Sequence, residues 1–418
     1  MKIAYIVPYV PNQIRTRSYN LISSLTELGH EVDVFTLGSN HVDMRDADAL
    51  KAKCCRVYYQ DQPVWRSLMN SALAVPSSKP LQSVYSWNPK LVSQLNVLLH
   101  KNGNHRNYDV VHVEHLRGST YGVFIKSQFP SMPVVWDSVD CISYLFKQAV
   151  GQSGSMFGKL MTRFELGRTR KAEGRLLSCF NHVLVTSETD KTALLDTLSK
   201  GTKPAPITVL QNGVDQGYFR INPDIKRDTE TLVFSGKMSY HANVSMVMYL
   251  YNEIMPRLWE KRPSVRLVVT GKDPPAEVRK LADSPHIYVT GTVNDIRPFL
   301  WKATAAVVPL VYGAGIQNKI LEAMATATPV ITNSKVLASL SVTPGKELLI
   351  ADTADEFAAC ALKLIENPDM GNEVGAAGLH YVKNNHNWRE SARQMVYIYS
   401  QLTPPALDTP GSLFESNL

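Results

Sequence analysis

The segment from Pro309 to Ala325 brings together residue types that can hold a phosphate group. A short apolar run ends at Pro309, and Gly313 and Gly315 allow a tight loop with close approach of the backbone to a ligand. A helix predicted to begin near Gln317 points its free N–H groups and its positive dipole end toward that loop, which favours a bound anion. The pattern therefore indicates a candidate diphosphate site.

Two charged residues on that helix extend the interpretation. Lys319 and Glu322 are three positions apart and share one helix face. Lys319 would lie beside the diphosphate, and Glu322 could accept hydrogen bonds from ribose hydroxyls. The alternative is an ordinary turn between a strand and a helix, with the lysine and the glutamate forming a solvated surface pair. Spacing alone leaves both interpretations open.

Polar residues that follow other predicted strands are further candidates. His115 follows the strand Val110–Val113, and a neutral imidazole there can donate to a hydroxyl or take a proton from one. Its alternative role is a hydrogen bond to a loop carbonyl. Asp140 follows the run Val134–Asp137 and is either an acceptor-side base or the N-cap of the next helix.

Basic residues are concentrated in the first half of the chain. Residues 1–205 hold 24 Lys and Arg against 16 Asp and Glu, a net charge of +8, whereas the remainder holds 20 against 21, a net charge of −1. Arg15 and Arg17 are placed in the loop after the first strand, facing either an anion or solvent. The segment 157–177 alternates apolar and basic residues at helical spacing, which suits an interfacial helix on anionic lipid or a core-facing helix with a solvated basic side.

Short apolar runs alternate with helical patterns along the whole chain, which predicts an α/β fold with parallel sheets covered on both faces. The runs fall into two doubly wound halves, which we expect to join near Lys200–Ile207. Ligands bind at the carboxyl ends of such strands, so two facing sheets place a cleft between the halves. The predicted strands are Lys2–Val7, Glu31–Thr36, Val110–Val113, Val134–Asp137, His182–Thr186, Thr231–Ser235, Val265–Thr270, His286–Val289, Ala305–Pro309 and Pro329–Thr332.

Composition excludes several classes of protein. The 418 residues are 44% hydrophobic and 19% charged, which argues against wholesale disorder. Five scattered cysteines without metal-ligand spacing fit a reducing cytosol and predict no metal site. No apolar run is long enough to span a membrane. Nucleic acid is a poor fit as a partner, because no aromatic platform interleaves the basic residues.

Several motifs in a fixed order resemble those of GT-B glycosyltransferases of the family 4 type. The resemblance covers most of residues 1–395. Its stretch from Gly315 to Ala325 is similar to sugar transferases linked to bacterial exopolysaccharide export, including PEP-CTERM-associated ones. The motifs are Gly29-His30-Glu31-Val32, Val185-Thr186-Ser187-Glu188, Gln211-Asn212-Gly213-Val214-Asp215, Ser235-Gly236-Lys237-Met238 and Leu321-Glu322-Ala323-Met324-Ala325 followed by Pro329-Val330-Ile331.

The resemblance implies two Rossmann-like domains facing across a cleft, with an acceptor-side domain at 1–204 and a nucleotide-sugar domain at 205–385. A C-terminal helix at 386–404 would pack back on the first domain, ahead of a flexible tail at 405–418. The implied activity is cytoplasmic transfer of a sugar from a nucleotide sugar to a glycan or lipid-linked acceptor. It would proceed with retention and without a metal or cofactor. The segment 157–177 adds an expected peripheral contact with the inner face of the plasma membrane.

Family positions also imply roles for single residues. Glu322 matches the glutamate that contacts ribose, Lys237 matches a cation on the diphosphate, and His115 matches a histidine near the anomeric carbon; these three form the implied catalytic set. The implied donor-binding set is Gly236, Gly313, Gly315, Ile316, Gln317, Asn318, Lys319 and Glu322, and the acceptor-side set is Arg15, Arg17 and Asp140.

Two positions depart from the family pattern. Ala314 replaces the first of two glutamates that the family spaces eight positions apart, and Ala242 replaces the usual second cation. The first departure leaves the donor sugar undetermined, and the second shifts phosphate binding toward Lys319. Two alternatives to sugar transfer remain: a nucleotide-sugar epimerase of the same fold, and an inactive nucleotide-sugar-binding subunit, which only the missing glutamate at Ala314 supports.

Overall fold

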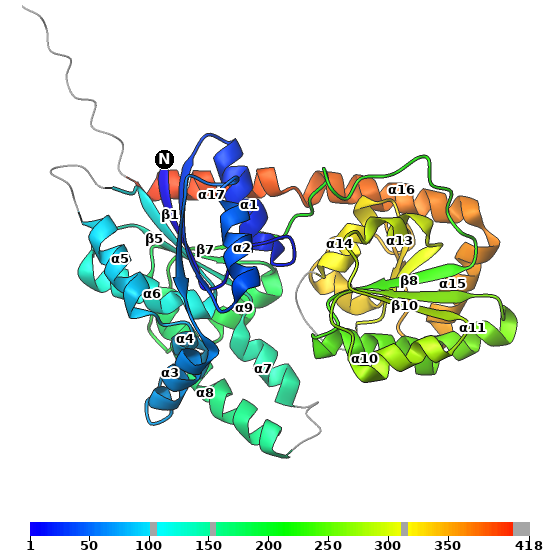
Figure 1. Cartoon of the computed structure of the whole chain (residues 1–418), viewed down its shortest axis with the longest axis horizontal. Coiled ribbons are helices and arrows are strands. Elements are labelled where there is room, and N and C mark those ends of the chain that lie inside the picture. Colours follow the sequence, from blue (N-terminus) through cyan, green and yellow to red (C-terminus); the bar gives the residue numbers. More distant parts are fainter. Residues whose placement is uncertain (101–106, 151–155, 311–316, 404–418) are drawn as a thin grey trace, which may run out of the picture.

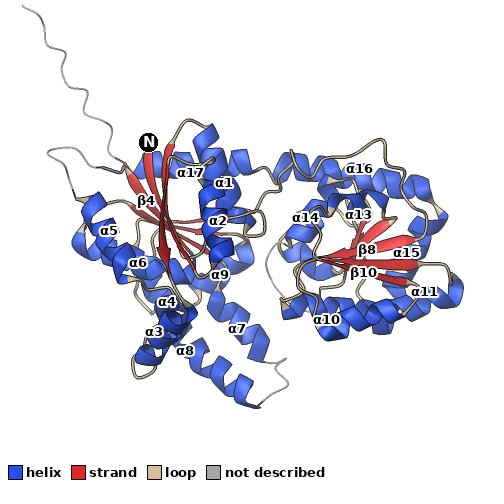
Figure 2. Ribbon diagram, in the orientation of Figure 1, coloured by secondary structure: helices blue, strands red, loops and turns tan. Residues whose placement is uncertain are grey.

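The computed structural model describes residues 1–100, 107–150, 156–310 and 317–403, with backbone only for 149–150 and 156–159. The chain forms two α/β lobes, and in each lobe helices cover both faces of a central parallel sheet (Figures 1 and 2). The predicted doubly wound architecture is therefore confirmed.

The N-terminal lobe is built on a seven-stranded sheet of order β3-β2-β1-β4-β5-β6-β7. Its central strands are apolar almost throughout because helices bury both faces. The strands are β1 (Lys2–Val7), β2 (Glu31–Gly38), β3 (Arg56–Asp61), β4 (Val110–Glu114), β5 (Val134–Val139), β6 (His182–Val185) and β7 (Ile207–Val209). The helices are α1 (Thr16–Glu27), α2 (His41–Leu50), α3 (Val64–Ala74), α4 (Leu81–Tyr85), α5 (Pro89–Leu99), α6 (His115–Gln128), α7 (Ile142–Val150), α8 (Met156–Cys179) and α9 (Glu188–Leu195).

The C-terminal lobe repeats the plan with a six-stranded sheet of order β10-β9-β8-β11-β12-β13. One continuous apolar core fills it. The strands are β8 (Thr231–Ser235), β9 (Arg266–Thr270), β10 (Ile287–Gly291), β11 (Ala305–Val308), β12 (Val330–Thr332) and β13 (Leu349–Ile350). The helices are α10 (His241–Tyr249), α11 (Met255–Lys261), α12 (Ala276–Arg279), α13 (Arg297–Lys302), α14 (Asn318–Ala325), α15 (Ala354–Glu366) and α16 (Pro368–Asn385); a π-helical turn, Leu250–Ile254, joins α10 to α11.

The chain crosses between the lobes twice. It leaves the first sheet only after β7, which pairs with β6, so the expected join at Lys200–Ile207 precedes the last strand of the first lobe. After α16 the chain returns, and α17 (Trp388–Leu402) packs against α1 of the N-terminal lobe (Figure 1). The Tyr399 hydroxyl lies 2.8 Å from Nδ1 of His112, so the last helix is tied into the first sheet.

Parallel register brings the strand ends of the N-terminal lobe to one edge. Ile6 on β1 pairs with Val113 on β4, and Glu114 on β4 pairs with Asp137 on β5. Residues that follow β1, β4 and β5 therefore lie side by side at the edge that faces the second lobe. In the described part of the chain, no helix combines the length and apolar character that crossing a bilayer requires.

Candidate active site

A cavity of about 620 Å³ lies between the lobes and takes its lining from both. The N-terminal lobe contributes the loop after β1, the end of β5 and the first turn of α7. The C-terminal lobe contributes the ends of β8, β9 and β10 and the start of α14. The lining residues used below are Thr16, Val139, Asp140, Leu145, Gly236, Lys237, Asn243, Gly271, Lys272, Gln317, Asn318, Lys319 and Glu322.

The start of α14 forms one wall of this cavity, with Lys319 and Glu322 on the same face as expected. Lys319 is buried, and its Nζ donates to Oδ1 of Asn243 at 2.7 Å. Burial lowers the pKa of Lys319 to about 8, with the Glu322 charge acting in the opposite direction. Burial raises the pKa of Glu322 to about 7, opposed by Lys319. Both groups therefore titrate near neutral pH, where a bound anion or hydroxyl can shift them.

Two matching turns form the adjacent wall. Strand β8 ends in Ser235-Gly236-Lys237, and its neighbour β9 ends in Thr270-Gly271-Lys272. Both glycines adopt positive φ, 157° and 151°, and a Cβ at Gly271 would lie 1.8 Å from the carbonyl oxygen of Gly236. This close approach requires glycine and fixes the two turns against each other. Lys237 and Lys272 both line the cavity and are exposed.

Lys272 and Asn243 were missed in the sequence. The signal for Lys272 was present, since a glycine-lysine pair follows each of two consecutive strands. The neighbouring strand order that makes the repeat meaningful comes only from the fold. Asn243 accepts from Lys319 and donates to the carbonyl oxygen of Lys237, at 2.8 Å, so one amide connects the α14 wall to the β8 turn.

The lobes touch beside this cavity. Nδ2 of Asn318 donates to Oγ1 of Thr16 at 3.0 Å, which connects the first residue of α14 to the first residue of α1. The predicted glycine loop, with Gly313, Gly315 and Ile316, lies outside the described residues, as does Ala314. The remaining predicted donor-site residues, Gly236, Gln317, Asn318, Lys319 and Glu322, meet at the cavity together with Lys237.

Asp140 lines the opposite, N-terminal side of the cavity. Its alternative role as a helix cap is taken by other carboxylates, because the amide of Cys141 donates to Asp190 at 2.9 Å and that of Ile142 donates to Glu173 at 2.7 Å. Burial raises the pKa of Asp140 to about 7, and the charge of Asp190 adds to the effect. A carboxyl that titrates near pH 7 beside a cavity can exchange a proton with a hydroxyl.

Comparison with known proteins identifies both lobes. Residues 14–217 match the family described as Glycosyltransferase Family 4, and residues 229–367 match the family described as Glycosyl transferases group 1. The chain is a family 4 glycosyltransferase. This assignment agrees with the predicted resemblance and with the predicted enzyme class.

Individual relatives of the transferase are distant. An uncharacterized 44.6 kDa protein from the cps region of Klebsiella pneumoniae is 21% identical over 373 residues, which is 87% of this chain and 89% of that protein. The D-inositol 3-phosphate glycosyltransferase of a Nocardioides species is 24% identical over 225 residues, 47% of this chain and 48% of that protein.

Solved structures share the fold over nearly the whole chain. Sucrose-phosphate synthase from Thermosynechococcus elongatus has a TM-score of 0.65 at 18% identity, covering 96% of this chain and 98% of its own. HepE from Anabaena, solved in complex with UDP and glucose, has a TM-score of 0.66 at 14% identity, covering 96% and 100%. At these identities the likeness concerns the fold alone.

Of the two arginines expected on the acceptor side of the transferase, Arg17 faces inward and Arg15 stays exposed. Arg17 lies within α1, not in the loop, and its guanidinium contacts Asp137, with Nε and Nη2 2.9 and 2.8 Å from Oδ2. Its Nη1 donates to the carbonyl oxygen of Leu210 at 3.0 Å and to Oδ1 of Asn212 at 2.7 Å. Arg17 is thus buried and holds the linker between the lobes, which corrects the anion-facing expectation.

The side chain of Arg15 is 41% exposed to solvent. Its Nη1 lies 3.6 Å from Oδ1 of Asp43, and its guanidinium stacks over the ring of Tyr9 at 5.2 Å. It is not among the described residues that line the cavity, although its neighbours Ile14 and Thr16 are. These contacts explain how Arg15 fixes the loop after β1 without reaching the cavity.

His115 opens α6 directly after β4 and adopts a left-handed φ of 62°. Its Nε2 lies 3.8 Å from Oε1 of the buried Glu114, and burial lowers its pKa to about 4. Val139, at the end of neighbouring β5, also has a positive φ, of 65°, and lines the cavity. Left-handed non-glycine residues cost energy and concentrate at functional sites. His115 itself is not among the described cavity-lining residues.

Glu114 belongs to a buried polar network below His115 that sequence reasoning did not find. The hydroxyls of Tyr5 and Tyr9 both donate to its carboxylate, that of Tyr5 at 2.8 Å. Burial raises the pKa of Glu114 to about 7, with a further contribution from the Asp137 charge. The network fixes the end of β4 from below, so His115 is held in place and neutral.

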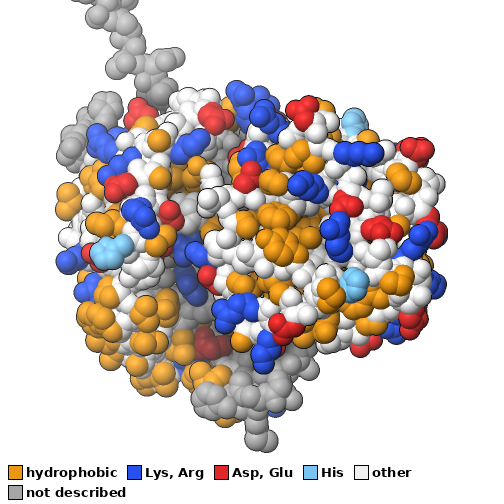
Figure 3. Space-filling model, turned by 45° about the vertical axis from the view of Figure 1, so that its right-hand side comes forward, with side chains coloured by type: hydrophobic (Ala, Val, Ile, Leu, Met, Phe, Trp, Pro, Cys, Tyr) orange, Lys and Arg blue, Asp and Glu red, His pale blue; other side chains and the backbone are white. Residues whose placement is uncertain are grey.

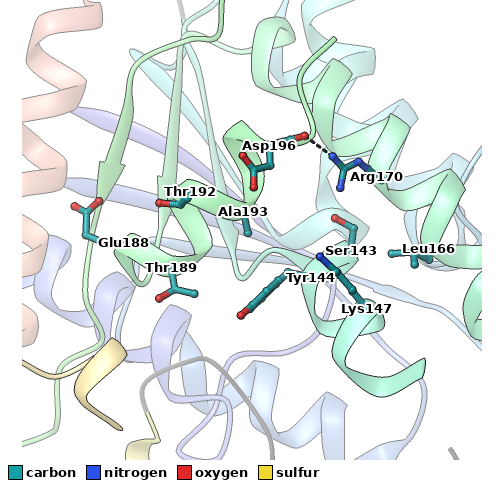
Figure 4. Close-up of a pocket in the computed structure, with 10 residues that line it drawn as sticks. All are labelled: Ser143, Tyr144, Lys147, Leu166, Arg170, Glu188, Thr189, Thr192, Ala193 and Asp196. Carbon is teal, nitrogen blue, oxygen red and sulfur yellow. Dashed lines mark hydrogen bonds between the residues drawn. The ribbon is translucent and has the colours of Figure 1, made fainter. Parts of the chain in front are cut away.

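A second cavity, of about 630 Å³, lies between α7, α8 and α9 of the N-terminal lobe (Figure 4). Tyr144 and Lys147 line it from α7, and Arg170 on α8 hydrogen-bonds the backbone oxygen of Asp196 beyond α9. Leu145, the neighbour of Tyr144, lines the first cavity, so α7 separates the two spaces. Within the described residues, no group of three or more His, Cys, Asp and Glu side chains could hold a metal ion.

Proposed function

We propose that this transferase moves a sugar from a nucleoside diphosphate sugar to a hydroxyl of a glycan or lipid-linked acceptor, with retention and without a metal. The observation that carries the proposal is the paired arrangement of Lys319 and Glu322 on α14 opposite the Lys237 and Lys272 turns. Three ammonium groups and one carboxyl on adjoining walls match a ligand that joins a diphosphate to a ribose.

In this assignment the diphosphate lies between the two glycine-lysine turns and the first turn of α14. Lys237, Lys272 and the helix dipole stabilise the charge that grows on the leaving phosphate, which is the role a metal ion would otherwise have. Glu322 accepts hydrogen bonds from the ribose hydroxyls. UDP is the first nucleotide to test, because HepE was solved with UDP and with UDP-glucose.

The reaction needs one bond made and one broken. The acceptor oxygen bonds to the anomeric carbon, the bond from that carbon to the phosphate oxygen breaks, and the acceptor proton passes to the departing phosphate. No protein nucleophile is required on this route, and closure of the lobes keeps water out. Asp140 would orient the acceptor hydroxyl. The neutral His115 would donate a hydrogen bond to a hydroxyl of the donor sugar.

A thermal-shift series with UDP, GDP and ADP, followed by their sugars, tests the donor assignment. We expect one diphosphate to raise the melting temperature and Glu322→Ala to abolish most of that shift, because ligands that bind only the folded state stabilise it. A chain that no nucleotide stabilises would contradict the proposal. So would isomerisation of the donor in the absence of an acceptor, which would identify an epimerase.

The metal-free route has its own test. Treatment with EDTA, followed by assay in chelator, should leave the turnover of donor and acceptor unchanged, because lysines supply the positive charge. Loss of turnover that added Mg²⁺ or Mn²⁺ restores would contradict this part of the proposal. The resemblance of residues 315–325 to sugar transferases linked to exopolysaccharide export suggests surface-polysaccharide intermediates as the acceptors to screen first.

A further inference from the structure

The outer end of the N-terminal lobe exposes an apolar surface formed by α3 and α8. Nine of the twenty exposed large hydrophobic side chains among the described residues lie there, and Figure 3 shows apolar side chains gathered at this end, at the lower left. We call this set the end surface. It consists of Val64, Trp65, Leu68, Met69, Leu73 and Val75 on and after α3, and of Leu160, Met161 and Phe164 on α8.

Helix α3 presents its apolar face outward. Trp65, Leu68 and Leu73 are 60%, 59% and 72% exposed, whereas Ser67 and Ala74 on the other face are buried. An amphipathic helix of a globular protein normally does the reverse, with its apolar stripe on the core. A contiguous exposed apolar patch of this kind is typical of a surface that binds a membrane or another protein molecule.

Contacts between the two helices make the surface continuous. Nη1 of Arg168 on α8 donates to the carbonyl oxygens of Ala74 and Lys79, at 3.4 and 3.2 Å, where α3 ends. The same guanidinium lies 3.9 Å from the ring centre of Phe164. Phe164 is therefore held beside the end of α3.

The charges around the end surface have one sign. The sequence from 62 to 108 contains no Asp or Glu, and neither does the sequence from 141 to 164. The charged residues on and beside α3 and in the first half of α8 are Arg66, Lys79, Lys159, Arg163 and Glu165. Glu165 is buried and its carboxylate accepts a hydrogen bond from the amide of Leu81, so it does not add a negative charge to the end surface. A second copy docked on the same face would bring these like charges together, whereas anionic headgroups would neutralise them at about 1 kcal/mol per basic residue.

We propose that the end surface docks the transferase on an anionic lipid bilayer, with α3 and the first half of α8 lying in the interface. The sequence alone predicts a peripheral membrane contact through 157–177. In this proposal α3 supplies the larger part of that contact. Helix α7 packs along α8 and contributes Leu145 to the site cavity, so docking would hold the acceptor side of the site near lipid. This last consequence rests on the proposed transfer to a lipid-linked acceptor; the docking itself does not.

Co-sedimentation of the full chain with phosphatidylcholine vesicles, with and without phosphatidylglycerol, tests the docking. We expect binding to the anionic vesicles, weakened by added salt. The double variant Leu68→Glu/Leu73→Glu should bind about tenfold more weakly or worse, because burial of one leucine is worth about that factor. The control is Ile221→Glu, which alters an aliphatic residue that is 49% exposed and lies outside the end surface, and this variant should bind like the parent chain.

Tryptophan emission gives a second readout. Vesicles should shift the emission to shorter wavelength in the parent chain and leave Trp65→Phe nearly unshifted. The melting temperature and the nucleotide-induced shift should be unchanged in the leucine variant, which separates docking from folding and from the donor site. Vesicle binding that survives in the leucine variant would overturn the proposal. So would a dimer in solution that the same substitutions dissociate, which would assign the surface to a second copy.

Discussion

Glu322 and Lys319 are the residues whose charges should set the pH range of donor binding. In the free protein the pKa of Glu322 is raised to about 7 and that of Lys319 is lowered to about 8, both through burial. Donor binding needs the ionised carboxylate and the protonated amine. Affinity should therefore fall as the pH drops through 7, where Glu322 gains a proton, and fall again as it rises through 8, where Lys319 loses one.

The variant Glu322→Gln isolates the acidic side of this profile. An amide still accepts hydrogen bonds but does not titrate, so we expect affinity for the nucleotide sugar to be about tenfold lower at pH 8 and constant below 7. Isothermal titration calorimetry at a series of pH values measures this affinity. No acceptor is present, so no proton transfer between Asp140 and an acceptor hydroxyl takes place. Glu366→Gln, exposed on α15, is the control. An acidic limb that persists in Glu322→Gln would place the titrating group elsewhere.

Lys272 is the residue-scale prediction that only the structure provides. Lys272→Ala should weaken donor affinity by about tenfold, the value of one charge-assisted hydrogen bond to a phosphate. Lys237→Ala should lower turnover more than it lowers nucleotide affinity, because its contact strengthens as the phosphate departs. Steady-state kcat and KM distinguish these outcomes. Lys280→Ala is the control, because Lys280 is exposed on the same lobe and lies away from the cavity. If Lys272→Ala has the same kcat and KM as Lys280→Ala, Lys272 has no role in donor binding.

Sequence reasoning located site residues where chemistry and local pattern coincide. The α14 pair was found because helical spacing alone places Lys319 and Glu322 on one face. Arg17 was misplaced because its partners, Asp137 and Asn212, are 120 and 195 positions away and give no local signal. A similar separation concealed the Glu114 network, in which Tyr5 of β1 and Tyr9, just after β1, both donate to a carboxylate at the end of β4.

At the element scale, an edge position makes a strand harder to recognise in the sequence, although the edge strand β10 was predicted. The three strands missed in the sequence, β3, β7 and β13, all lie at sheet edges. An edge strand is short or half exposed, so it lacks the continuous apolar run of a central strand. The periodicity of apolar residues also does not tell which way a helix face points, so the sequence did not reveal that the apolar face of α3 points away from the core.

The two glycine-lysine turns act as one element, and Gly271→Ala tests this. A Cβ there would lie 1.8 Å from the Gly236 carbonyl, so the β8 turn must move and carry Lys237 with it. We expect donor affinity to fall by more than tenfold, besides a stability loss of about 1–3 kcal/mol from the backbone conformation. Gly345→Ala is the control, because Gly345 also has positive φ, 83°, a Cβ there meets no atom within 4 Å, and it is not among the described residues that line the cavity.

Urea unfolding and isothermal titration separate the two effects of these glycine variants. The control should lose stability through strain and keep its donor affinity. If Gly271→Ala behaves like Gly345→Ala in both measurements, the turns move independently and their contact has no role in binding.

At the scale of the whole molecule, the last helix belongs to the first lobe. Trp388, Met395 and Tyr399 of α17 join the core beneath β1 and α1, although the second lobe precedes them in sequence. The two crossings and the Arg17 contacts with Leu210 and Asn212 lie on the same side of the cleft. This arrangement suits a hinge that lets the lobes close on a donor while the rest of each lobe stays rigid.

Tyr399→Ala measures how far α17 is part of the N-terminal lobe. The side chain is fully buried and its hydroxyl is 2.8 Å from Nδ1 of His112, so we expect a loss of about 3–5 kcal/mol in unfolding free energy. Hydrogen exchange should show the loss in β1, β4 and α1 and leave the α14 lobe protected. Tyr397→Ala, 68% exposed on the same helix, should change stability by less than about 0.5 kcal/mol. If exchange instead rises first in the C-terminal lobe, α17 takes its stability from the lobe it follows, and the hinge must lie after it.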